Sequence, residues 1–349
     1  MTESTASATV RPATLWEALD TSTVRCLLCS HHCRIPAGQV GLCGVRENRD
    51  GQLFTLVYGR LVAENVDPIE KKPLYHLAPG SQSYSVATAG CNFRCKHCQN
   101  YQISQVADHS HLPGYPRTPE QVVAAAIDAG CRSIAYTYTE PTVFFEFALA
   151  CMKLAHRNGL LNVFVSNGYF SPQALDAAAP YLDAANIDLK AFTDTFYRQL
   201  CGARLDPVLN CIRALWQRGV WVESTTLVIP HRNDDPVELR ELARFLVSVS
   251  PDLPWHVTGF YPTYQLTEEP PTPAASLIEA RRIGLDAGLR YVYAGNRPGA
   301  GGEETACPQC ARVVIRRQGF RIVENELTAA GACRGCGTHI AGRAMGGDS

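Results

Sequence analysis

The sequence predicts an α/β protein whose central part is a partial TIM barrel of the (βα)6 type. Strand-like and helix-like segments alternate from residue 75 to residue 297, a pattern that predicts a parallel sheet with right-handed crossovers. Six or seven such units are too few for a complete eight-unit barrel, so we expect an open or partial one. The length of 349 residues and the 46% content of hydrophobic residues supply the apolar surface that so large a core needs.

Each expected element follows from hydrophobic periodicity and from the Gly, Pro and capping residues at which helices and strands begin or end. Strands are expected at residues 84–90, 133–140, 161–168, 185–190, 220–229, 256–261 and 290–294. Helices are expected at residues 119–129, 142–158, 172–181, 236–249 and 274–287, and residues 194–218 are expected to be mostly helical. Thr118 is the expected N-cap of the first of these helices, because its hydroxyl can accept a hydrogen bond from the first helical turn.

Three parts follow from this reading. Residues 1–74 form an N-terminal cysteine-rich extension, residues 75–297 form the barrel core, and residues 298–349 form a C-terminal four-cysteine module. The last part begins with a Gly-rich linker, Pro298–Gly302, which is typical of a boundary between structural units.

The overall charge is close to zero, with 32 basic and 33 acidic side chains and a net charge of −1. This balance argues against a dominant nucleic-acid or membrane-surface role. No apolar run reaches transmembrane length and no export signal is evident, so we expect a cytoplasmic protein.

Cysteine is unusually abundant, with 15 residues. In a reducing cytoplasm disulfides are a poor explanation for so many thiols. Most of the cysteines fall in three tight clusters, and such spacing indicates metal sites. The others are interpreted as small hydrophobic core residues: Cys131, Cys151, Cys201 and Cys211.

The central cluster has the spacing C-x3-C-x2-C, formed by Cys91, Cys95 and Cys98 directly after the first expected strand. The carboxyl ends of barrel strands are where active sites lie. A cubane iron–sulfur cluster usually has four thiolate ligands, so three cysteines would leave one iron open to a cofactor or substrate. Three buried cysteines in a turn, or part of a zinc site, are the structural alternatives.

This motif resembles the radical S-adenosylmethionine (SAM) superfamily, and the following Gln99-Asn100 resembles its branch of pyruvate formate-lyase activating enzymes. The resemblance implies a 4Fe–4S cluster whose open iron chelates the methionine part of SAM. It also implies that an electron from the cluster cleaves SAM to a 5′-deoxyadenosyl radical, which abstracts hydrogen from a substrate that remains unidentified.

Five further residues are candidate SAM contacts by this resemblance. Glu140 follows Thr139 where relatives carry a Gly-Gly-Glu-like segment, and its alternative role is a negative charge at a helix N-terminus. Ser166 and Asn167 end the third expected strand, where the alternative is an ordinary Asn-Gly turn. Asp188 and Lys190 share one face of the fourth strand and could instead be a structural ion pair.

The two flanking clusters each hold four cysteines. Two CxxC pairs in the tail predict a zinc-ribbon-like module with strands at 313–316 and 320–323, in which four thiolates close a tetrahedral site: Cys307, Cys310, Cys333 and Cys336. Zinc is favoured there, although iron–sulfur clusters also accept four cysteines. The head holds a possible second metal, zinc or another cluster, at Cys26, Cys29, Cys33 and Cys43.

Taken together, these segments resemble the AmmeMemoRadiSam system radical SAM enzyme over residues 20–344. The matching segments are Cys26–Ile35, Gly41–Arg46, Cys91–Cys95, Tyr136–Pro141, Gly295–Gly299, Cys307–Cys310 and Gly331–Cys333. His97 departs from the pattern, because relatives often carry Phe or Tyr there. The resemblance implies AMMECR-type and Memo-type partner proteins, and a reductant such as flavodoxin or ferredoxin.

Three other functions remain open at the level of sequence. A related one is activation of a glycyl-radical enzyme, which needs a partner that bears the radical-site glycine. An iron–sulfur electron-transfer protein would bind clusters without consuming SAM. A zinc-binding scaffold would use every cysteine cluster for structure alone and would bind no iron.

Overall fold

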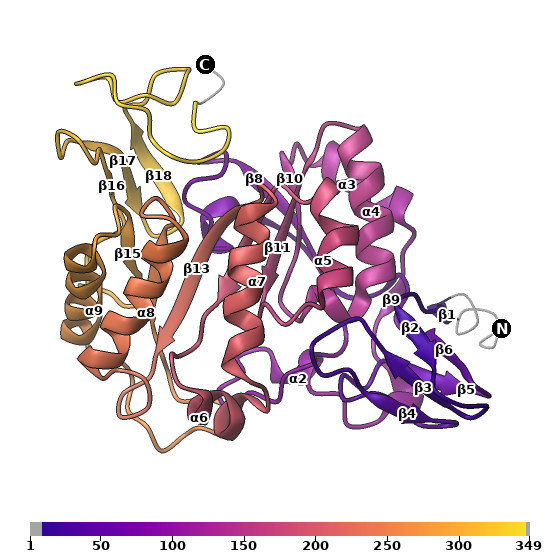
Figure 1. The fold of residues 1–349 in the computed structure, drawn as a ribbon. Helices are drawn as coiled ribbons and strands as arrows, with labels where there is room; N and C mark the ends of the chain where they lie inside the picture. Colours follow the sequence, from indigo (N-terminus) through magenta and orange to yellow (C-terminus); the bar gives the residue numbers. More distant parts are fainter. Residues whose placement is uncertain (1–8, 347–349) are drawn as a thin grey trace.

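The computed structural model describes residues 9–346 and contains a nine-stranded, mostly parallel sheet in the strand order β15-β14-β13-β12-β11-β10-β8-β7-β9. Seven of these strands run parallel to one another and form the predicted partial barrel (Figure 1). The strands are β8 (Gln82–Thr88), β10 (Ser133–Tyr136), β11 (Leu161–Ser166), β12 (Ala184–Asp188), β13 (Trp221–Val228), β14 (Trp255–Gly259) and β15 (Val292–Gly295). The α/β partial-barrel prediction is therefore confirmed.

Six main helices connect the parallel strands and cover the outer face of the sheet (Figure 1). They are α3 (Pro119–Asp128), α4 (Phe145–Arg157), α5 (Pro172–Ala178), α7 (Leu205–Gln217), α8 (Pro236–Val249) and α9 (Ala274–Ala287). Shorter segments are α2 (Tyr101–Ser104), α6 (Asp194–Phe196), the 3-10 turns Ile69–Lys71, His109–His111, Pro141–Phe144 and Ala179–Tyr181, and the π-helical turn Tyr197–Cys201. Thr118 caps α3 as predicted, since its hydroxyl accepts a hydrogen bond from the Gln121 backbone N–H at 3.3 Å.

Several predicted strands run past their observed ends, and the one predicted at residues 133–140 does so by the most. Strand β10 ends at Tyr136, so the expectation of a strand up to Glu140 is wrong for its last four residues. The reason is local backbone geometry, because Tyr138 has a φ of +63°, which breaks the extended conformation. Glu140 then begins the 3-10 turn Pro141–Phe144 by accepting a hydrogen bond from the Thr142 backbone N–H.

Two antiparallel strands extend the sheet beyond β8, and the sequence patterns did not predict them. Strand β7 (Arg60–Pro68) pairs along β8, and the short β9 (Tyr115–Pro116) pairs with β7. These strands cover the sheet edge that an incomplete barrel leaves open. Because β7 precedes residue 75, the N-terminal extension contributes a strand to the core sheet; the predicted boundary at residue 74 stays a prediction.

The N-terminal part forms two small antiparallel sheets. Their hydrophobic side chains, among them Val24 and Ile35, belong to the same buried cluster as the barrel core, so this part packs directly on the barrel. One sheet is β1 (Arg11–Pro12), β6 (Gln52–Thr55) and β5 (Arg46–Arg49); the other is β2 (Trp16–Ala18), β3 (Thr23–Cys26) and β4 (Arg34–Pro36).

The C-terminal module is a third antiparallel sheet, of β16 (Thr305–Ala306), β17 (Val313–Gln318) and β18 (Arg321–Asn325). It lies at the opposite end of the barrel from α2 and α6 (Figure 1). Its buried Ile315 and Ile340 share one hydrophobic cluster with Tyr75 and Tyr293 of the barrel, so the module closes the end at which the parallel strands begin.

A buried carboxylate organises that closed end. Glu223 on β13 is fully buried and accepts hydrogen bonds from the backbone N–H groups of Tyr75 and His76, at 3.0 and 2.8 Å. It also accepts bonds from Trp221 Nε1 at 3.1 Å and lies 2.6 Å from His256 Nε2 on β14. Although burial opposes the charge, these partners hold the pKa of Glu223 below its usual value.

Within residues 9–346, no helix is both long enough and apolar enough to cross a lipid bilayer.

We expect Gly90→Ala to destabilise the protein more than the matched change Gly130→Ala. Both glycines have positive φ, of +104° and +66°, so alanine at either costs about 1–2 kcal/mol. A Cβ at Gly90 would also lie 2.8 Å from Val45 Cγ1, whereas one at Gly130 meets no atom within 4 Å. That crowding adds about 1–3 kcal/mol at Gly90. Urea unfolding of both variants measures the difference, and equal losses would contradict the packing described here.

Candidate active site

The three cysteines of the central motif line one cavity of about 530 Å³ at the carboxyl ends of the barrel strands. A cavity of this size is in the range of small-molecule and cofactor sites. Every candidate SAM contact named from the sequence lines the same cavity, from three separate segments of the chain: Glu140, Ser166, Asn167, Asp188 and Lys190. The fold thus brings the predicted site residues together, although their roles remain predictions.

The cysteine loop is held in place by the π-helical turn Tyr197–Cys201. The backbone N–H groups of Arg94 and Lys96 donate to the carbonyl oxygens of Cys201 and Leu200, at 2.8 and 2.9 Å. A π-helical turn leaves carbonyl groups free to accept such bonds, and turns of this kind occur often at functional sites. The loop therefore has a fixed backbone path over the cavity.

The thiols of this loop suit a metal cluster. Burial raises the pKa of Cys91 and Cys98, while a hydrogen bond from the Cys201 thiol lowers the pKa of Cys95. Thiolates buried in this way become stable when bound to a metal. Hydrogen-bond donors also face the sulfurs: the Phe93 N–H lies 3.4 Å from Cys91 Sγ, and Ser104 Oγ lies 3.1 Å from Cys98 Sγ. This donor set fits an iron–sulfur cluster held by three cysteines.

Glu140 is fully buried and already has several partners. Its Oε1 accepts hydrogen bonds from the Thr142 hydroxyl at 2.6 Å and the Ser166 hydroxyl at 2.8 Å, and its Oε2 accepts one from the Asn167 backbone N–H at 2.8 Å. These bonds favour the alternative in which Glu140 caps the following turn and joins the ends of β10 and β11. One lone pair of Oε2 remains for a ligand, so its contact with SAM stays a prediction.

Asn167 links the third strand to the cysteine loop. Its side-chain amide donates to Asn92 Oδ1 at 2.7 Å and approaches Cys91 Sγ at 3.8 Å. Its own Oδ1 accepts a bond from the Tyr169 backbone N–H at 3.2 Å. Asn167 thus does more than form an ordinary Asn-Gly turn, because its amide group orients the Asn92 side chain next to Cys91.

Asp188 and Lys190 form the ion pair considered in the sequence analysis, with Nζ and Oδ2 2.8 Å apart, and both line the cavity. Burial opposes the charge on Lys190, but Asp188 and the sulfurs of Cys95 and Cys201 raise its pKa well above the usual value. The ammonium group therefore stays charged beside the cysteine loop, where it can balance the negative charge of a thiolate-bound cluster.

The structure gives Cys201 and His97 defined places beside Cys95. Cys201, interpreted from sequence as a core hydrophobe, has its sulfur within 4.8 Å of the ligand atoms of Cys95 and His97. Burial and the nearby charge of Lys190 lower the pKa of His97 to about 3, so its ring is neutral and packs 5.9 Å from the Phe196 ring. A neutral aromatic ring at this position is physically close to the Phe or Tyr of the pattern.

A further group of cavity residues surrounds Asp67 of β7, and the sequence analysis did not single out Asp67, Lys71 or Lys72. Lys71, Lys72 and Tyr138 line the cavity, and all three contact Asp67. Lys72 Nζ lies 2.6 Å from Asp67 Oδ2, with both side chains buried. Although burial opposes the charge, hydrogen bonds from the two lysines and Tyr138 hold the pKa of Asp67 well below its usual range. The adjacent lysines were the only signal in the sequence.

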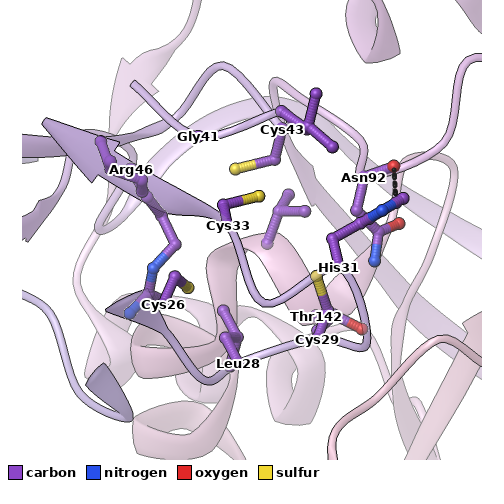
Figure 2. A pocket seen from close by; sticks show the side chains of 13 residues that line it. Cys26, Leu28, Cys29, His31, Cys33, Gly41, Cys43, Arg46, Asn92 and Thr142 are labelled. Atoms are coloured by element: carbon purple, nitrogen blue, oxygen red, sulfur yellow. Dashed lines mark hydrogen bonds between the residues drawn. The ribbon is translucent and has the colours of Figure 1, made fainter. Parts of the chain in front are cut away.

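The flanking cysteine clusters differ in geometry. In the C-terminal module the four sulfurs lie within 4.8 Å of one another, with 3.5 Å between Cys307 and Cys336 and 3.8 Å between Cys310 and Cys333. The N-terminal cysteines line a separate small pocket, shown in Figure 2. Neither cluster lines the large cavity.

Comparison with known proteins agrees with this site. The chain matches the Radical SAM superfamily over residues 85–245. It is 42% identical over 334 residues to the uncharacterized protein MJ0808 of Methanocaldococcus jannaschii, covering 95% of this chain and 99% of that protein. It is 25% identical over 191 residues to a putative glycyl-radical enzyme activating enzyme, MJ1632, of the same organism, covering 52% and 68% of the two chains.

Two solved structures share the fold. A radical SAM methyltransferase from Sphaerobacter thermophilus has a TM-score of 0.50 and 15% identity, with 87% of this chain and 82% of that chain covered. Streptococcus suis SuiB bound to S-adenosylmethionine has a TM-score of 0.50 and 14% identity, with 69% and 56% covered. At 15% and 14% identity, these two structures show the fold alone. The match to the Radical SAM superfamily, with which the barrel and the cysteine loop agree, defines a radical SAM enzyme. The chain belongs to the radical SAM superfamily, which implies a 4Fe–4S cluster and SAM as cofactors.

We expect Asp67→Asn to lower the free energy of unfolding by about 3 kcal/mol at pH 7, because it leaves Lys72 buried without its counter-charge. Since the folded pKa of Asp67 is lowered, its stabilising effect is present above the unfolded value of 3.8 and is lost as pH falls below it. The difference between wild type and variant should therefore shrink from pH 7 to pH 3 in urea unfolding. The exposed Asp128→Asn is the control, and a deficit that does not change with pH would contradict this assignment.

Proposed function

We propose that this enzyme cleaves SAM reductively and uses the resulting radical to abstract hydrogen from a substrate that is still unidentified. The observation that carries the proposal is the single cavity in which Cys91, Cys95 and Cys98 face the polar strand ends of β10 to β12. Three thiolates leave one iron of a cubane open, and the facing polar groups can bind the ligand of that iron. When bound, the cluster and SAM supply the electron transfer and the 5′-deoxyadenosyl radical.

Residues around the cysteine loop would stabilise the charge of the cluster and exclude water from it. The Asn167 amide and the Ser104 hydroxyl lie beside the sulfurs of Cys91 and Cys98, where hydrogen bonds stabilise thiolate charge. The Lys190 ammonium lies beside Cys95 and pairs with Asp188. The neutral His97 ring is buried at the cavity wall, where it can pack against an aromatic base and exclude water.

We expect anaerobically reconstituted and reduced protein to convert SAM to 5′-deoxyadenosine, and Cys95→Ala to abolish the product. Chromatographic quantification of 5′-deoxyadenosine is the measurement. The matched control is Cys131→Ala, a buried cysteine outside all three clusters, which should retain wild-type turnover.

Intact SAM in the presence of a reducible cluster would contradict the proposal and favour the electron-transfer alternative. Absence of iron altogether would favour the zinc-scaffold alternative.

The particular enzyme that we propose is the AmmeMemoRadiSam system member, with AMMECR-type and Memo-type proteins as partners and flavodoxin or ferredoxin as the electron donor. The support is the set of matching sequence segments across the chain, from Cys26 to Cys333.

Activation of a glycyl-radical enzyme is the second candidate, favoured by the similarity to a protein named as a putative enzyme of that kind. A 5′-deoxyadenosine assay with each purified partner would distinguish the two, because only the true substrate should increase turnover.

We also propose that the C-terminal module binds zinc. Tetrahedral zinc with Zn–S bonds of about 2.3 Å places its four sulfurs roughly 3.8 Å apart. The observed distances of 3.5 and 3.8 Å agree with that geometry. The module packs on the closed end of the barrel through few apolar residues, so the metal would contribute to its folding.

Metal analysis should find one zinc ion per chain, and Cys310→Ser should lose it because the remaining three thiolates bind zinc more weakly. The thermal midpoint of the variant should fall as well, while Cys131→Ala should keep both the zinc and the midpoint. Retention of zinc in Cys310→Ser, with the thermal midpoint unchanged, would contradict a zinc site in this module.

A further inference from the structure

We infer that the N-terminal pocket formed by Cys26, Cys29, Cys33 and Cys43 is the site of a second iron–sulfur cluster, a cubane held by all four cysteines. This site is separate from the large cavity, and the inference does not depend on the proposed reaction. Four thiolates would complete the coordination of such a cluster and leave no iron open.

The four cysteines reach the pocket from different segments of the N-terminal part. Cys26 ends β3, Cys29 and Cys33 lie in the loop between β3 and β4, and Cys43 lies in the loop before β5. All four line one pocket, and Figure 2 shows their side chains surrounding it. Two antiparallel sheets thus bring together thiols of which the first and last, Cys26 and Cys43, have 16 residues between them in the sequence.

The spacing of the sulfurs distinguishes a cubane from a single zinc ion. Within residues 9–346, the sets of three or more potential ligand atoms that lie within 4.8 Å of one another are the C-terminal four cysteines and the group around Cys95. The N-terminal sulfurs are more widely spaced than the zinc-like set. The same holds for Cys91, Cys95 and Cys98, which do not form such a set either. In a cubane each thiolate binds a different iron, so the thiolates lie further apart than around one zinc ion.

Two buried N–H donors at this pocket have no hydrogen-bond partner among the described residues. They are Arg46 Nε and Asn92 Nδ2, and both side chains line the pocket (Figure 2). Arg46 is 1% exposed and Asn92 is 3% exposed. An unpartnered buried donor costs about 1–3 kcal/mol unless a ligand accepts its bond. The sulfides and thiolates of a cluster are such acceptors, and the guanidinium also offsets their negative charge.

The pocket shares a wall with the active site. Asn92 lines the pocket, while its neighbour Cys91 lines the large cavity. The Asn92 carbonyl lies 2.8 Å from His31 Nε2, and its side chain accepts a bond from Asn167 at 2.7 Å. A cluster in this pocket would therefore lie directly behind the first cysteine of the active-site loop, on the side of the N-terminal sheets.

Anaerobic reconstitution with iron and sulfide tests the inference in the triple variant Cys91→Ala, Cys95→Ala, Cys98→Ala. This full-length chain lacks the active-site ligands but keeps the N-terminal pocket. We expect about four iron and four sulfide per chain, against about eight of each in the wild type. After reduction with dithionite, its electron paramagnetic resonance signal should not change when SAM is added, because no iron is open.

The converse variant Cys29→Ser, Cys33→Ser should lose about half of the wild-type iron and keep the signal that responds to SAM. Cys131→Ala, with its thiol outside every cluster, should match the wild type in both measurements. If the converse variant fails to fold, the iron content of the triple variant still tests whether the N-terminal pocket binds a cluster.

A triple variant that binds no iron, or that binds a second zinc ion in its place, would overturn the inference. Failure of 5′-deoxyadenosine formation in the wild type would overturn the proposed reaction and leave this iron count unchanged, so the two proposals fail in distinguishable ways.

Discussion

Much of the architecture depends on the hydrogen bonds that the fully buried carboxylate of Glu223 accepts. A barrel of seven parallel strands falls short of the eight of a complete barrel, so its interior must be closed by other means. Glu223 binds the chain at Tyr75 and His76, and it also contacts His256 on the next strand. Removing this acceptor would leave several buried donors without partners, at a cost of several kcal/mol. With one end closed in this way, the opposite end of the strands remains available for the site.

The open end gains its chemistry from segments that are distant in sequence. The cysteine loop after β8 is held by the π-helical turn Tyr197–Cys201, and the ends of β10 and β11 are joined through Glu140. Within the loop, the sulfur of Cys91 lies next to the Asn167 amide, and the sulfur of Cys95 lies near the Lys190 ammonium. The site is therefore pre-organised by hydrogen bonds within the chain, and the partly buried thiols of the loop supply the soft ligands that iron prefers.

The three cysteine clusters illustrate how geometry separates metal sites of the same composition. The C-terminal sulfurs, such as Cys307 and Cys336 at 3.5 Å, have the spacing of a single tetrahedral ion. The N-terminal set is wider, encloses a small pocket and faces the unpartnered donors of Arg46 and Asn92. Metal type in such proteins depends on the distances that the backbone imposes as much as on the number of thiols.

The sequence by itself determined the alternation of strands and helices, the cap at Thr118 and the C-x3-C-x2-C motif, because periodicity, capping and ligand spacing are local properties. Only the tertiary structure decided which side chains meet. It placed Cys201 beside Cys95, paired Asp67 with Lys72, and showed that Glu140 is occupied by hydrogen bonds from neighbouring strands. The contacts of Cys201 and Glu140 join residues that are distant along the chain, so no pattern of short period could reveal them. Asp67 and Lys72 are only five residues apart, but their pairing depends on the burial of both side chains in the fold. Spacing in sequence also could not distinguish a wide set of sulfurs from a tight one, since that difference arises from how the sheets fold around each pocket.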